Sequence, residues 1–365
     1  MLQKGNITKL LVKPTAINRL LLPLSGLYGL VTDLRNWLFN NQLKEVYRAS
    51  IRTVSVGNLT VGGTGKTPMV EFLIKWYLNK GGADAYQAVT LSRGYGRKTS
   101  GFRVAGPDDT ATTLGDEPLQ VYRKFGRQVR VCVGERRADA IQTIERIYPN
   151  TRLIILDDAF QHRAVQPDVN LLLTDYARLF VADHPFPAGR LRERRQGARR
   201  ADAVIVTKCP VALPATEQHR IAGLIRQYAR PDVPVFFAGL AYQRPVPFSG
   251  STSPALTGPV VLVSGLANAD PLDEYVRTEY TLLSHRRYAD HYAYTRADLE
   301  RVMAELPAGA SVLTTEKDWV KLDALLTPAE RAQWPLYYLP VGTQLLDGSD
   351  RQFDQFLNEQ ILKNP

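Results

Sequence analysis

The chain has 365 residues with ordinary hydrophobic (44%) and charged (22%) fractions, so we expect a folded protein of two domains, or one large domain with additions. Its two cysteines, Cys132 and Cys209, lie far apart, which excludes a disulfide scaffold and a cysteine-based zinc site and suits a reducing cytosol. The formal net charge of +10 indicates an anionic partner: nucleic acid, an acidic membrane surface or a phosphorylated substrate.

The first predicted element is an amphipathic helical segment near the N-terminus. Thirteen uncharged, mostly apolar residues lie between Arg19 and Asp33, fewer than the ~20 that a membrane-spanning helix needs. No signal-peptide cleavage site follows them. We expect a helix or helix pair, broken near Pro23, that lies in the plane of an anionic membrane; a helical hairpin packed on the core is the alternative, and one helix can do both. The flanking basic residues and the interfacial aromatic residues are Lys4, Lys9, Lys13, Arg19, Arg35, Lys44, Arg48, Tyr28 and Trp37.

A phosphate-binding P-loop is predicted in residues 52–73, RTVSVGNLTVGGTGKTPMVEFL. A β-branched strand at Thr53–Val56 leads into a glycine-rich turn, and a helix opens near Pro68. Glycines allow backbone N–H groups to point at phosphate oxygens, and the helix N-terminus adds partial positive charge. We expect Lys66 to reach the β- and γ-phosphates and the Thr67 hydroxyl to ligate Mg²⁺. The predicted nucleotide-binding residues are Thr60, Val61, Gly62, Gly63, Thr64, Gly65, Lys66 and Thr67.

One feature of this loop departs from the usual P-loop pattern, which begins with a glycine where Thr60 stands. An ordinary glycine-rich turn is therefore the alternative interpretation. The order of strand, Gly-Lys-Thr and helix favours the P-loop.

Strands and helices alternate after the P-loop. Such alternation implies a mostly parallel sheet covered by helices on both faces, with ligands at the carboxyl ends of the strands. The polar clusters SRGYGR, GDEP, DDAFQH and Thr207-Lys208 fall at those ends. The predicted elements are strands at Ala85–Leu91, Gln128–Val133, Arg152–Leu156, Asp168–Thr174, Ala203–Thr207 and Val233–Gly239, and helices at 116–125 and Glu135–Tyr148.

Several acidic side chains are candidates for chemistry at the carboxyl ends of the strands. Asp157 and Asp158 end an apolar strand and can hold Mg²⁺ directly or through water. An isolated aspartate there is often a helix cap, but the upstream P-loop favours the metal. A kinase must also remove a proton from its acceptor hydroxyl, and Asp116, Glu117 and the histidines are the candidates; His291 follows Asp290 near the domain junction. The arginine-rich loop 184–200 is either a solvated face or an anion-binding element.

A second, smaller α/β unit follows a shift to proline, serine, glycine and threonine around Tyr242–Thr257. We predict an N-terminal helical segment at 1–48, a P-loop domain at 49–242 and a C-terminal α/β domain at 243–365, whose last helix can pack back on the P-loop domain. The elements predicted in the second unit are strands at Val260–Ser264, Glu279–Leu283, Ser311–Thr315 and Leu336–Leu339, and helices at Asp270–Arg277, Thr295–Glu305 and Arg351–Leu362.

Together these motifs resemble the tetraacyldisaccharide 4′-kinase family. The matching stretches, in the family's order, are VGNLTVGGTGKTP, SRGYGR, GDEP, VGERR, DDAFQH, PAGRLRE, Thr207-Lys208, GLANAD, ADHYAYTRADL and TTEKD. The resemblance implies transfer of the γ-phosphate of ATP, with Mg²⁺, to the 4′-hydroxyl of a tetraacylated glucosamine disaccharide 1-phosphate, giving lipid IVA. It also implies two α/β domains with the active site between them. The expected location is the cytoplasmic face of a bacterial inner membrane, with no nucleic acid and no obligate protein partner.

The resemblance also implies roles for individual residues. Asp116 looks like the catalytic base, paired with His291, and Lys66 looks like the phosphate-binding catalytic residue. The predicted metal ligands are Thr67, Glu117, Asp157 and Asp158, and the predicted substrate-binding residues are Arg93, Tyr95, Arg192 and Glu193. Ala159 and Arg190 replace residues that are common in the family's motifs, and neither is assigned chemistry.

The main alternative is a P-loop switch protein, a GTPase or an ATPase that acts on nucleic acid. Such a protein would carry a guanine-reading NKxD motif or aromatic residues within its basic run. The nearest match to NKxD is Thr207-Lys208-Cys209-Pro210, and the run Arg190–Arg200 contains no aromatic residue. A purely structural protein at the membrane surface would leave the P-loop unexplained.

Overall fold

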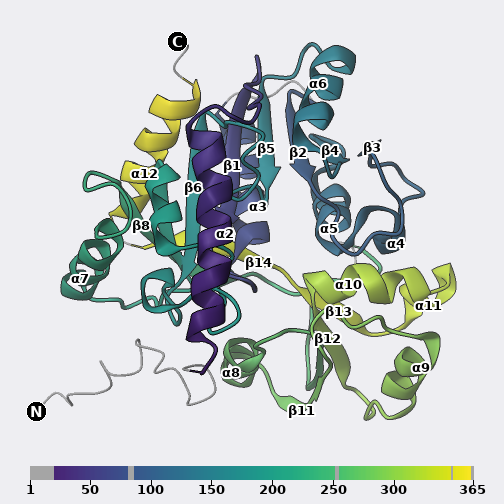
Figure 1. Cartoon of the computed structure of the whole chain (residues 1–365). Coiled ribbons are helices and arrows are strands. Elements are labelled where there is room, and N and C mark those ends of the chain that lie inside the picture. Colours follow the sequence, from purple (N-terminus) through teal and green to yellow (C-terminus); the bar gives the residue numbers. More distant parts are fainter. Residues whose placement is uncertain (1–19, 81–85, 251–254, 347, 363–365) are drawn as a thin grey trace, which may run out of the picture.

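The computed structural model describes residues 20–80, 86–250, 255–346 and 348–362, which form two α/β lobes (Figure 1). The first lobe is the larger, and the second lies beside one end of its sheet, at the lower right of Figure 1. The predictions for residues 1–19 lie outside the described residues.

The first lobe is built on a nine-stranded sheet with the order β14-β8-β7-β6-β1-β5-β2-β4-β3. The strands from β8 to β4 pair in parallel, and only the edge strands β3 and β14 are antiparallel. The predicted mostly parallel α/β sheet is therefore confirmed. The strands are β1 (Arg52–Asn58), β2 (Ala88–Ser92), β3 (Arg103–Val104), β4 (Arg130–Val133), β5 (Leu153–Asp157), β6 (Val169–Asp175), β7 (Ala203–Thr207), β8 (Val235–Tyr242) and β14 (Val341–Leu345).

Helices cover both faces of this sheet. The strands are apolar on both sides, so alternate residues of β5 enter different cores: Ile155 packs with α3, α5 and α12, and Ile154 packs with α6. Helix α7 covers the same face as α6, over β6 and β7. The helices of this lobe are α3 (Lys66–Asn79), α4 (Ala111–Leu114), α5 (Asp116–Phe125), α6 (Arg137–Ile147), α7 (Ala215–Arg226) and α12 (Ser349–Leu357).

The second lobe has a five-stranded sheet with the order β11-β10-β12-β13-β9, parallel except at the edge strand β9. Thr295 and Asp298 form a complete capping box at the start of α9. The predicted strand at Glu279–Leu283 is wrong, because α8 continues through Glu279 and the strand begins at Leu282. The elements are β9 (Val246–Pro247), β10 (Val260–Ser264), β11 (Leu282–Arg287), β12 (Ser311–Thr315), β13 (Leu336–Leu339), α8 (Asp270–Glu279), α9 (Arg296–Ala304), α10 (Glu316–Leu322) and α11 (Pro328–Gln333).

The chain returns to the first lobe after β13. Strand β14 pairs with β8, and Phe353 and Leu357 of α12 are buried in the core of the first lobe, where Phe353 meets Phe236. The C-terminal part of the chain therefore closes the outer edge of the first sheet. The predicted division at residues 242 and 243 stays a proposal.

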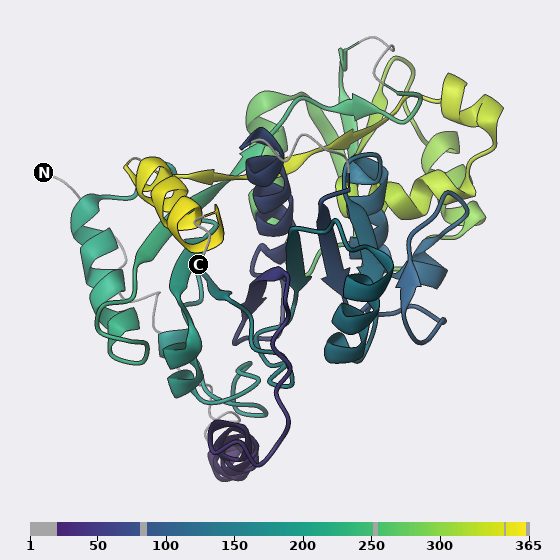
Figure 2. The same ribbon diagram turned by 90° about the horizontal axis from the view of Figure 1, so that it is seen from above.

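Helix α2 (Leu22–Asn40) lies outside the layers of the first lobe, and Figure 2 shows it end-on at the margin of the molecule. It begins at Leu22 with Pro23 in its first turn, where the missing N–H breaks no helical hydrogen bond. Its inward face is small and polar, with Ser25, Gly29 and Thr32 buried. Its outward face is apolar and exposed, at Leu22, Leu24, Leu27, Leu30, Val31, Leu34 and Trp37. Among the described helices, none is long and apolar enough to cross a bilayer.

A buried ion triad joins the two lobes. Lys124 of α5 contacts Glu71 of α3 and lies 2.6 Å from Oε1 of Glu316, the first residue of α10. The side chains of both glutamates are only 2% exposed. Beside this triad, Arg123 donates a hydrogen bond of 2.7 Å to Asp323 of the second lobe. These charged contacts thus hold α5 of the first lobe against the second lobe.

Replacement of Lys124 by methionine should lower the free energy of unfolding by about 3–5 kcal/mol, because two buried carboxylates lose their shared cation. Urea denaturation followed by tryptophan fluorescence measures this change. The matched control is Lys80→Met, which breaks a largely exposed ion pair with Asp354 and should cost no more than about 1 kcal/mol. Equal effects of the two substitutions would contradict the stabilising role of the triad.

Candidate active site

The predicted P-loop connects the end of β1 to the start of α3 and is held on one side by the arginine-rich loop 184–200. Val61 donates its backbone N–H to the carbonyl of Arg190 at 2.8 Å. Within the loop, the Asn58 amide donates to the Thr64 hydroxyl at 2.7 Å. Gly65 has φ +81°, a conformation that L side chains rarely adopt. The strand, the turn and the helix therefore follow in the predicted order, and the loop has a defined shape.

Three predicted site residues meet at the carboxyl end of β5. Lys66 Nζ lies 3.7 Å from Oδ1 of Asp158. The Arg192 guanidinium donates to both carboxylate oxygens of Asp158, at 2.9 and 3.0 Å. Asp158 itself has φ +48°, so the left-handed backbone lies at 158, and Ala159 carries no such strain. The structure thus brings the P-loop lysine and two residues from distant motifs together.

Asp157 has the properties of a cation ligand. Its Oδ1 is buried and has no hydrogen-bond partner among the described residues. Burial, followed by the negative charges of Glu117 and Asp158, raises the pKa of Asp157 to about 7, although Lys66 opposes this shift. A cation would stabilise the ionised carboxylate. The described residues contain no group of three or more acidic, histidine or cysteine side chains placed to hold a metal, and Mg²⁺ commonly takes one or two carboxylates and completes its shell with phosphates and water.

Asp116 and His291 come from different lobes and meet at the N-terminus of α5. His291 Nδ1 lies 3.3 Å from Oδ2 of Asp116, and Lys321 Nζ lies 3.1 Å from the same oxygen. On the other side of the imidazole, Lys317 Nζ lies 3.1 Å from Nε2 and 2.8 Å from Oδ1 of Asp290. Because Nε2 faces a donor and Nδ1 faces an acceptor, these partners assign the proton of a neutral imidazole to Nδ1.

Lys317 and Lys321 were not predicted from the sequence. They lie on α10, which begins directly after the carboxyl end of β12. The sequence signal was therefore present, because Glu316-Lys317-Asp318 is a polar cluster at a strand end like those in the first lobe. What the pattern does not show is that α10 packs against α5.

The SRGYGR loop lies beside this pair. Arg93 follows directly after β2, and the exposed Tyr95 (81%) has its ring 6.2 Å from that of His291. Gly115, just before Asp116, has φ +95°, and a Cβ there would lie 2.8 Å from the Tyr95 carbonyl. The close approach of the two loops therefore requires glycine at 115.

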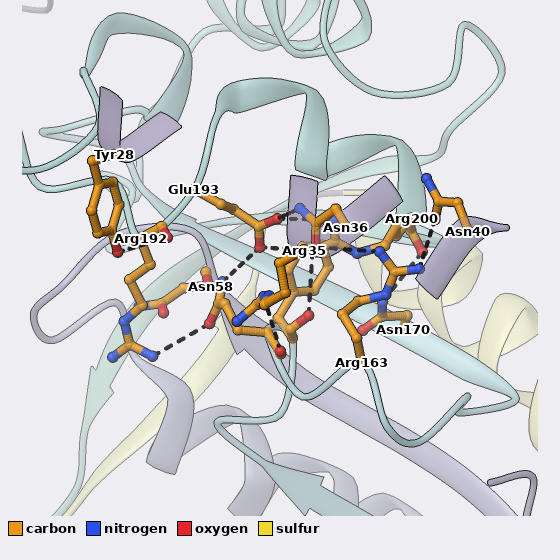
Figure 3. A network of polar contacts seen from close by, with 12 residues as sticks. Tyr28, Arg35, Asn36, Asn40, Asn58, Arg163, Asn170, Arg192, Glu193 and Arg200 are labelled. Carbon is orange, nitrogen blue, oxygen red and sulfur yellow. Dashed lines mark hydrogen bonds and ion pairs between the residues drawn. The ribbon is translucent and has the colours of Figure 1, made fainter. Parts of the chain in front are cut away.

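Glu193 occupies a different environment from the other predicted site residues, because it is fully buried (0% exposed). Figure 3 shows the network around it: Glu193 accepts hydrogen bonds from Arg200 at 2.7 and 3.0 Å, from Asn36 of α2 at 2.8 Å and from Gln161 at 3.1 Å. Gln161 also donates to the backbone carbonyl of Asn58. A carboxylate with no exposed surface has no room for direct contact with a substrate, so we propose that Glu193 positions the P-loop strand and α2.

The same loop, residues 184–200, carries most of the contacts of α2. Tyr28 donates its hydroxyl to the Arg192 carbonyl at 3.0 Å, and Ser25 accepts a hydrogen bond of 2.8 Å from the N–H of Ala188. Asp33 forms an ion pair of 3.2 Å with Arg194. Arg192, Arg194, Arg195 and Arg200 of this loop are thus bonded within the protein, whereas Arg190 and Arg199 are exposed, so the loop is a solvated face only in part. Arg192, next to Asp158, is the arginine that reaches the site.

Comparison with known proteins gives consistent results. The family model described as tetraacyldisaccharide-1-P 4′-kinase matches residues 17–362. A tetraacyldisaccharide 4′-kinase of Cytophaga hutchinsonii is 39% identical over 345 residues, covering 93% of each chain. One from Parabacteroides distasonis is 37% identical over 359 residues, covering 94% of this chain and 95% of its own. In fold, the chain is similar to the crystal structure of "apo" form LpxK from Aquifex aeolicus in complex with ATP, with a TM-score of 0.72 and 24% identity over 94% of this chain and 99% of that one.

Glu193→Gln should lower the free energy of unfolding by about 2–4 kcal/mol at neutral pH, since it leaves the Arg200 cation without its partner. Burial alone would raise the pKa of Glu193, but Arg200 and the amides of Asn36 and Gln161 hold it below its usual value. The carboxylate therefore stabilises the fold above the ordinary glutamate pKa of about 4.3 and loses this effect as the pH falls through the lower native value.

Urea denaturation of both proteins at several pH values measures this difference, which should shrink in acid. Glu300→Gln is the control, because Glu300 forms an exposed pair with Arg296. A Glu193→Gln protein as stable as the control at pH 7 would show that the buried network does not hold the site together.

Proposed function

This chain belongs to the tetraacyldisaccharide-1-P 4′-kinase family, and from that premise we propose that it transfers the γ-phosphate of ATP to the 4′-hydroxyl of tetraacyldisaccharide 1-phosphate. The product is lipid IVA, an intermediate of lipid A biosynthesis. The observation that carries the proposal is the contact of Asp116 with His291 and Lys321, which joins the two lobes at the sheet edge that holds the P-loop.

Asp116 is the general base of the proposed reaction. Both His291 and Lys321 contact Oδ2, so we assign Oδ1 to the acceptor. As the 4′-oxygen bonds to the γ-phosphorus, its proton passes to Asp116 and the bond to the leaving ADP breaks. His291 holds the carboxylate in place through its Nδ1–H, and Lys317 holds the imidazole through Nε2.

The phosphates of ATP are bound by P-loop N–H groups within residues 60–67, other than that of Val61, which is bonded to Arg190, and by Lys66. Thr67, Glu117, Asp157 and Asp158 would hold Mg²⁺, which neutralises charge on the phosphates when it is bound. Arg192, which pairs with Asp158, adds a second cation close to Lys66 to stabilise negative charge. Arg93 and Tyr95 contact the sugar or its phosphate.

Helix α2 is the proposed membrane contact. Its polar face packs on the protein and its leucine-rich face is exposed, the reverse of a helix that covers a protein core. Such a face suits the interface of an anionic bilayer, here the cytoplasmic leaflet of the inner membrane, from which an acylated disaccharide is drawn.

A P-loop switch protein or nucleic-acid ATPase is the disfavoured alternative. The sequence has Pro210 where a guanine-reading motif carries aspartate, and the run Arg190–Arg200 lacks the aromatic residues on which bases stack. The family match covers nearly the whole chain, and the kinase is therefore the better conclusion.

Purified protein with Mg·ATP and tetraacyldisaccharide 1-phosphate should form a lipid phosphorylated at the 4′ position, detected by mass spectrometry and ³¹P NMR. Asp116→Asn keeps the size of the side chain but cannot accept the proton, so its kcat should fall by at least ~10²-fold. Folding is checked by circular dichroism. No product from folded wild-type protein would refute the kinase, and near-normal turnover of Asp116→Asn would remove Asp116 from the proton transfer.

Substitution of Leu27, Leu30 and Leu34 together by serine should weaken binding to anionic liposomes, because about 60% of each of these side chains is exposed and each contributes apolar area to an interface. Flotation of full-length protein with vesicles measures the effect. Val211→Ser replaces an exposed apolar residue in the loop between β7 and α7; it is the control and should bind as the wild type does. Equal binding of the triple variant would refute the interfacial role of α2.

A further inference from the structure

A serine, an aspartate and a histidine of the second lobe form a chain of hydrogen bonds to which the proposed reaction assigns no role. His285 on β11 contacts the other two through its two ring nitrogens. Nε2 lies 2.8 Å from the hydroxyl of Ser264, the last residue of β10, and Nδ1 lies 2.8 Å from Oδ1 of Asp273 on α8. These contacts have the geometry of a Ser-His-Asp triad, and the order of the three residues along the chain is that of α/β-hydrolases.

The surroundings of the triad do not suit a nucleophile. Ser264 is only 1% exposed and the side chain of His285 only 4%, so the hydroxyl is closed to a substrate. In an α/β-hydrolase the backbone N–H of the residue after the nucleophile helps to bind the oxyanion. Here the Gly265 N–H donates to Oδ2 of Asp318 at 2.8 Å. The role of the triad must therefore lie in the elements that it holds together.

His285 is a neutral imidazole with a defined proton position. Burial lowers the pKa of His285, although the hydrogen bond with Asp273 opposes this shift. Nδ1 has two polar neighbours, Oδ1 of Asp273 at 2.8 Å and Nε of Arg287 at 3.3 Å. The closer carboxylate can only accept, so the proton lies on Nδ1 and Nε2 accepts the hydroxyl of Ser264. Arg287 also donates to Asp270 at 2.7 Å, which adds a second link between β11 and α8.

The end of β10 supports the loop that carries His291. The Ser264 carbonyl accepts a hydrogen bond of 2.8 Å from the N–H of Tyr288, the first residue after β11. A Cβ at Gly265 would lie 3.0 Å from the Ala289 carbonyl, so the loop packs directly on this glycine. The end of β10 therefore sets the position from which the loop leaves β11.

The same end of β10 also contacts α10, which has an anchor of its own. Asp318 of α10, whose side chain is fully buried, accepts a hydrogen bond from the Gly265 N–H, and its Oδ1 lies 3.9 Å from Nζ of Lys321, the lysine that contacts Asp116. The Thr315 hydroxyl donates to the same carboxylate at 2.8 Å. A disturbance of β10 would therefore reach the loop after β11 more than it would reach α10.

We propose that His285 is a positioning residue of the phosphoryl transfer: by joining the Ser264 hydroxyl to α8, it fixes the end of β10 and the orientation of the loop that carries His291. The inference rests on the proposed kinase function. His291 Nδ1 lies 3.3 Å from Oδ2 of Asp116, so a small displacement of the loop breaks this contact. A misplacement of about 1 Å can cost up to about 10²-fold in rate.

The test measures steady-state kinetics of the full-length protein with Mg·ATP and tetraacyldisaccharide 1-phosphate. His285→Ala should lower kcat about tenfold. The KM for ATP should change less than about twofold, because the P-loop of the first lobe binds the nucleotide. His285→Gln keeps an acceptor for the Ser264 hydroxyl and should stay within about threefold of the wild-type kcat. The matched control is His219→Ala, which removes an exposed histidine of α7 and should leave kcat unchanged.

A double-mutant cycle separates positioning from a general loss of structure. In a His291→Ala background the group that His285 positions is already absent, so His285→Ala should lower kcat less than about twofold there. Circular dichroism and urea denaturation check folding. If His285→Ala does not fold, Ser264→Ala carries the same cycle, because it removes a single hydroxyl; its expected loss in the wild-type background is about fivefold.

The outcomes separate this inference from the kinase proposal. A loss of kcat that appears only while His291 is present supports the positioning role. An unchanged kcat in folded His285→Ala, or an equal loss in both backgrounds, overturns the inference and leaves the kinase intact. Absence of 4′-phosphorylated product from folded wild-type protein would overturn the kinase proposal and the positioning role together.

Discussion

The buried ion triad of Lys124, Glu71 and Glu316 is the interaction on which the arrangement of this protein depends. It holds α5 of the first lobe against α10 of the second. These two helices carry Asp116 and Lys321, so the same interface that buries the charges also assembles the polar groups of the site. Because an unpaired charge in the protein interior costs several kcal/mol, movement between the lobes that keeps the triad intact must carry α5 together with α10.

Backbone strain is concentrated near the P-loop and the pair formed by Asp116 and His291. Of the five non-glycine residues with positive φ in the described chain, three are Asp158, Lys208 and His291. Each follows a strand or opens a loop beside the P-loop or the acid–imidazole pair, and each is held by contacts with a distant part of the chain. Such conformations cost of order 1–3 kcal/mol and persist only where the surroundings determine them. The surrounding contacts thus fix the orientation of these side chains before any ligand binds.

Helix α2 reverses the usual amphipathic arrangement, because the contacts that attach it are polar. Asn36 reaches the buried Glu193, which is bonded through Gln161 to the strand that leads into the P-loop. A leucine-rich face packed on the protein would attach the helix by hydrophobic burial but would leave no apolar surface for a lipid. The polar attachment leaves that surface free and places it next to the loop that carries Arg192. The proposed lipid contact and the proposed phosphate chemistry are therefore adjacent in one molecule.

The amino-acid sequence by itself determined the features that depend on local pattern. Continuous apolar runs predicted strands buried on both faces, and therefore a parallel sheet. The glycines before Lys66 predicted the P-loop, and the two aspartates after an apolar run predicted the acidic end of β5. The tertiary structure decided what depends on contacts between distant residues. Asp116 and His291 are 175 positions apart, and no periodic pattern in the sequence predicts that they meet. The same holds for the approach of Lys321 to Asp116 and for the return of β14 to the first sheet. Glu193 lies in a run of charged residues that looks exposed in the sequence, and its carboxylate is buried by tertiary contacts with Asn36 of α2, Gln161 and Arg200.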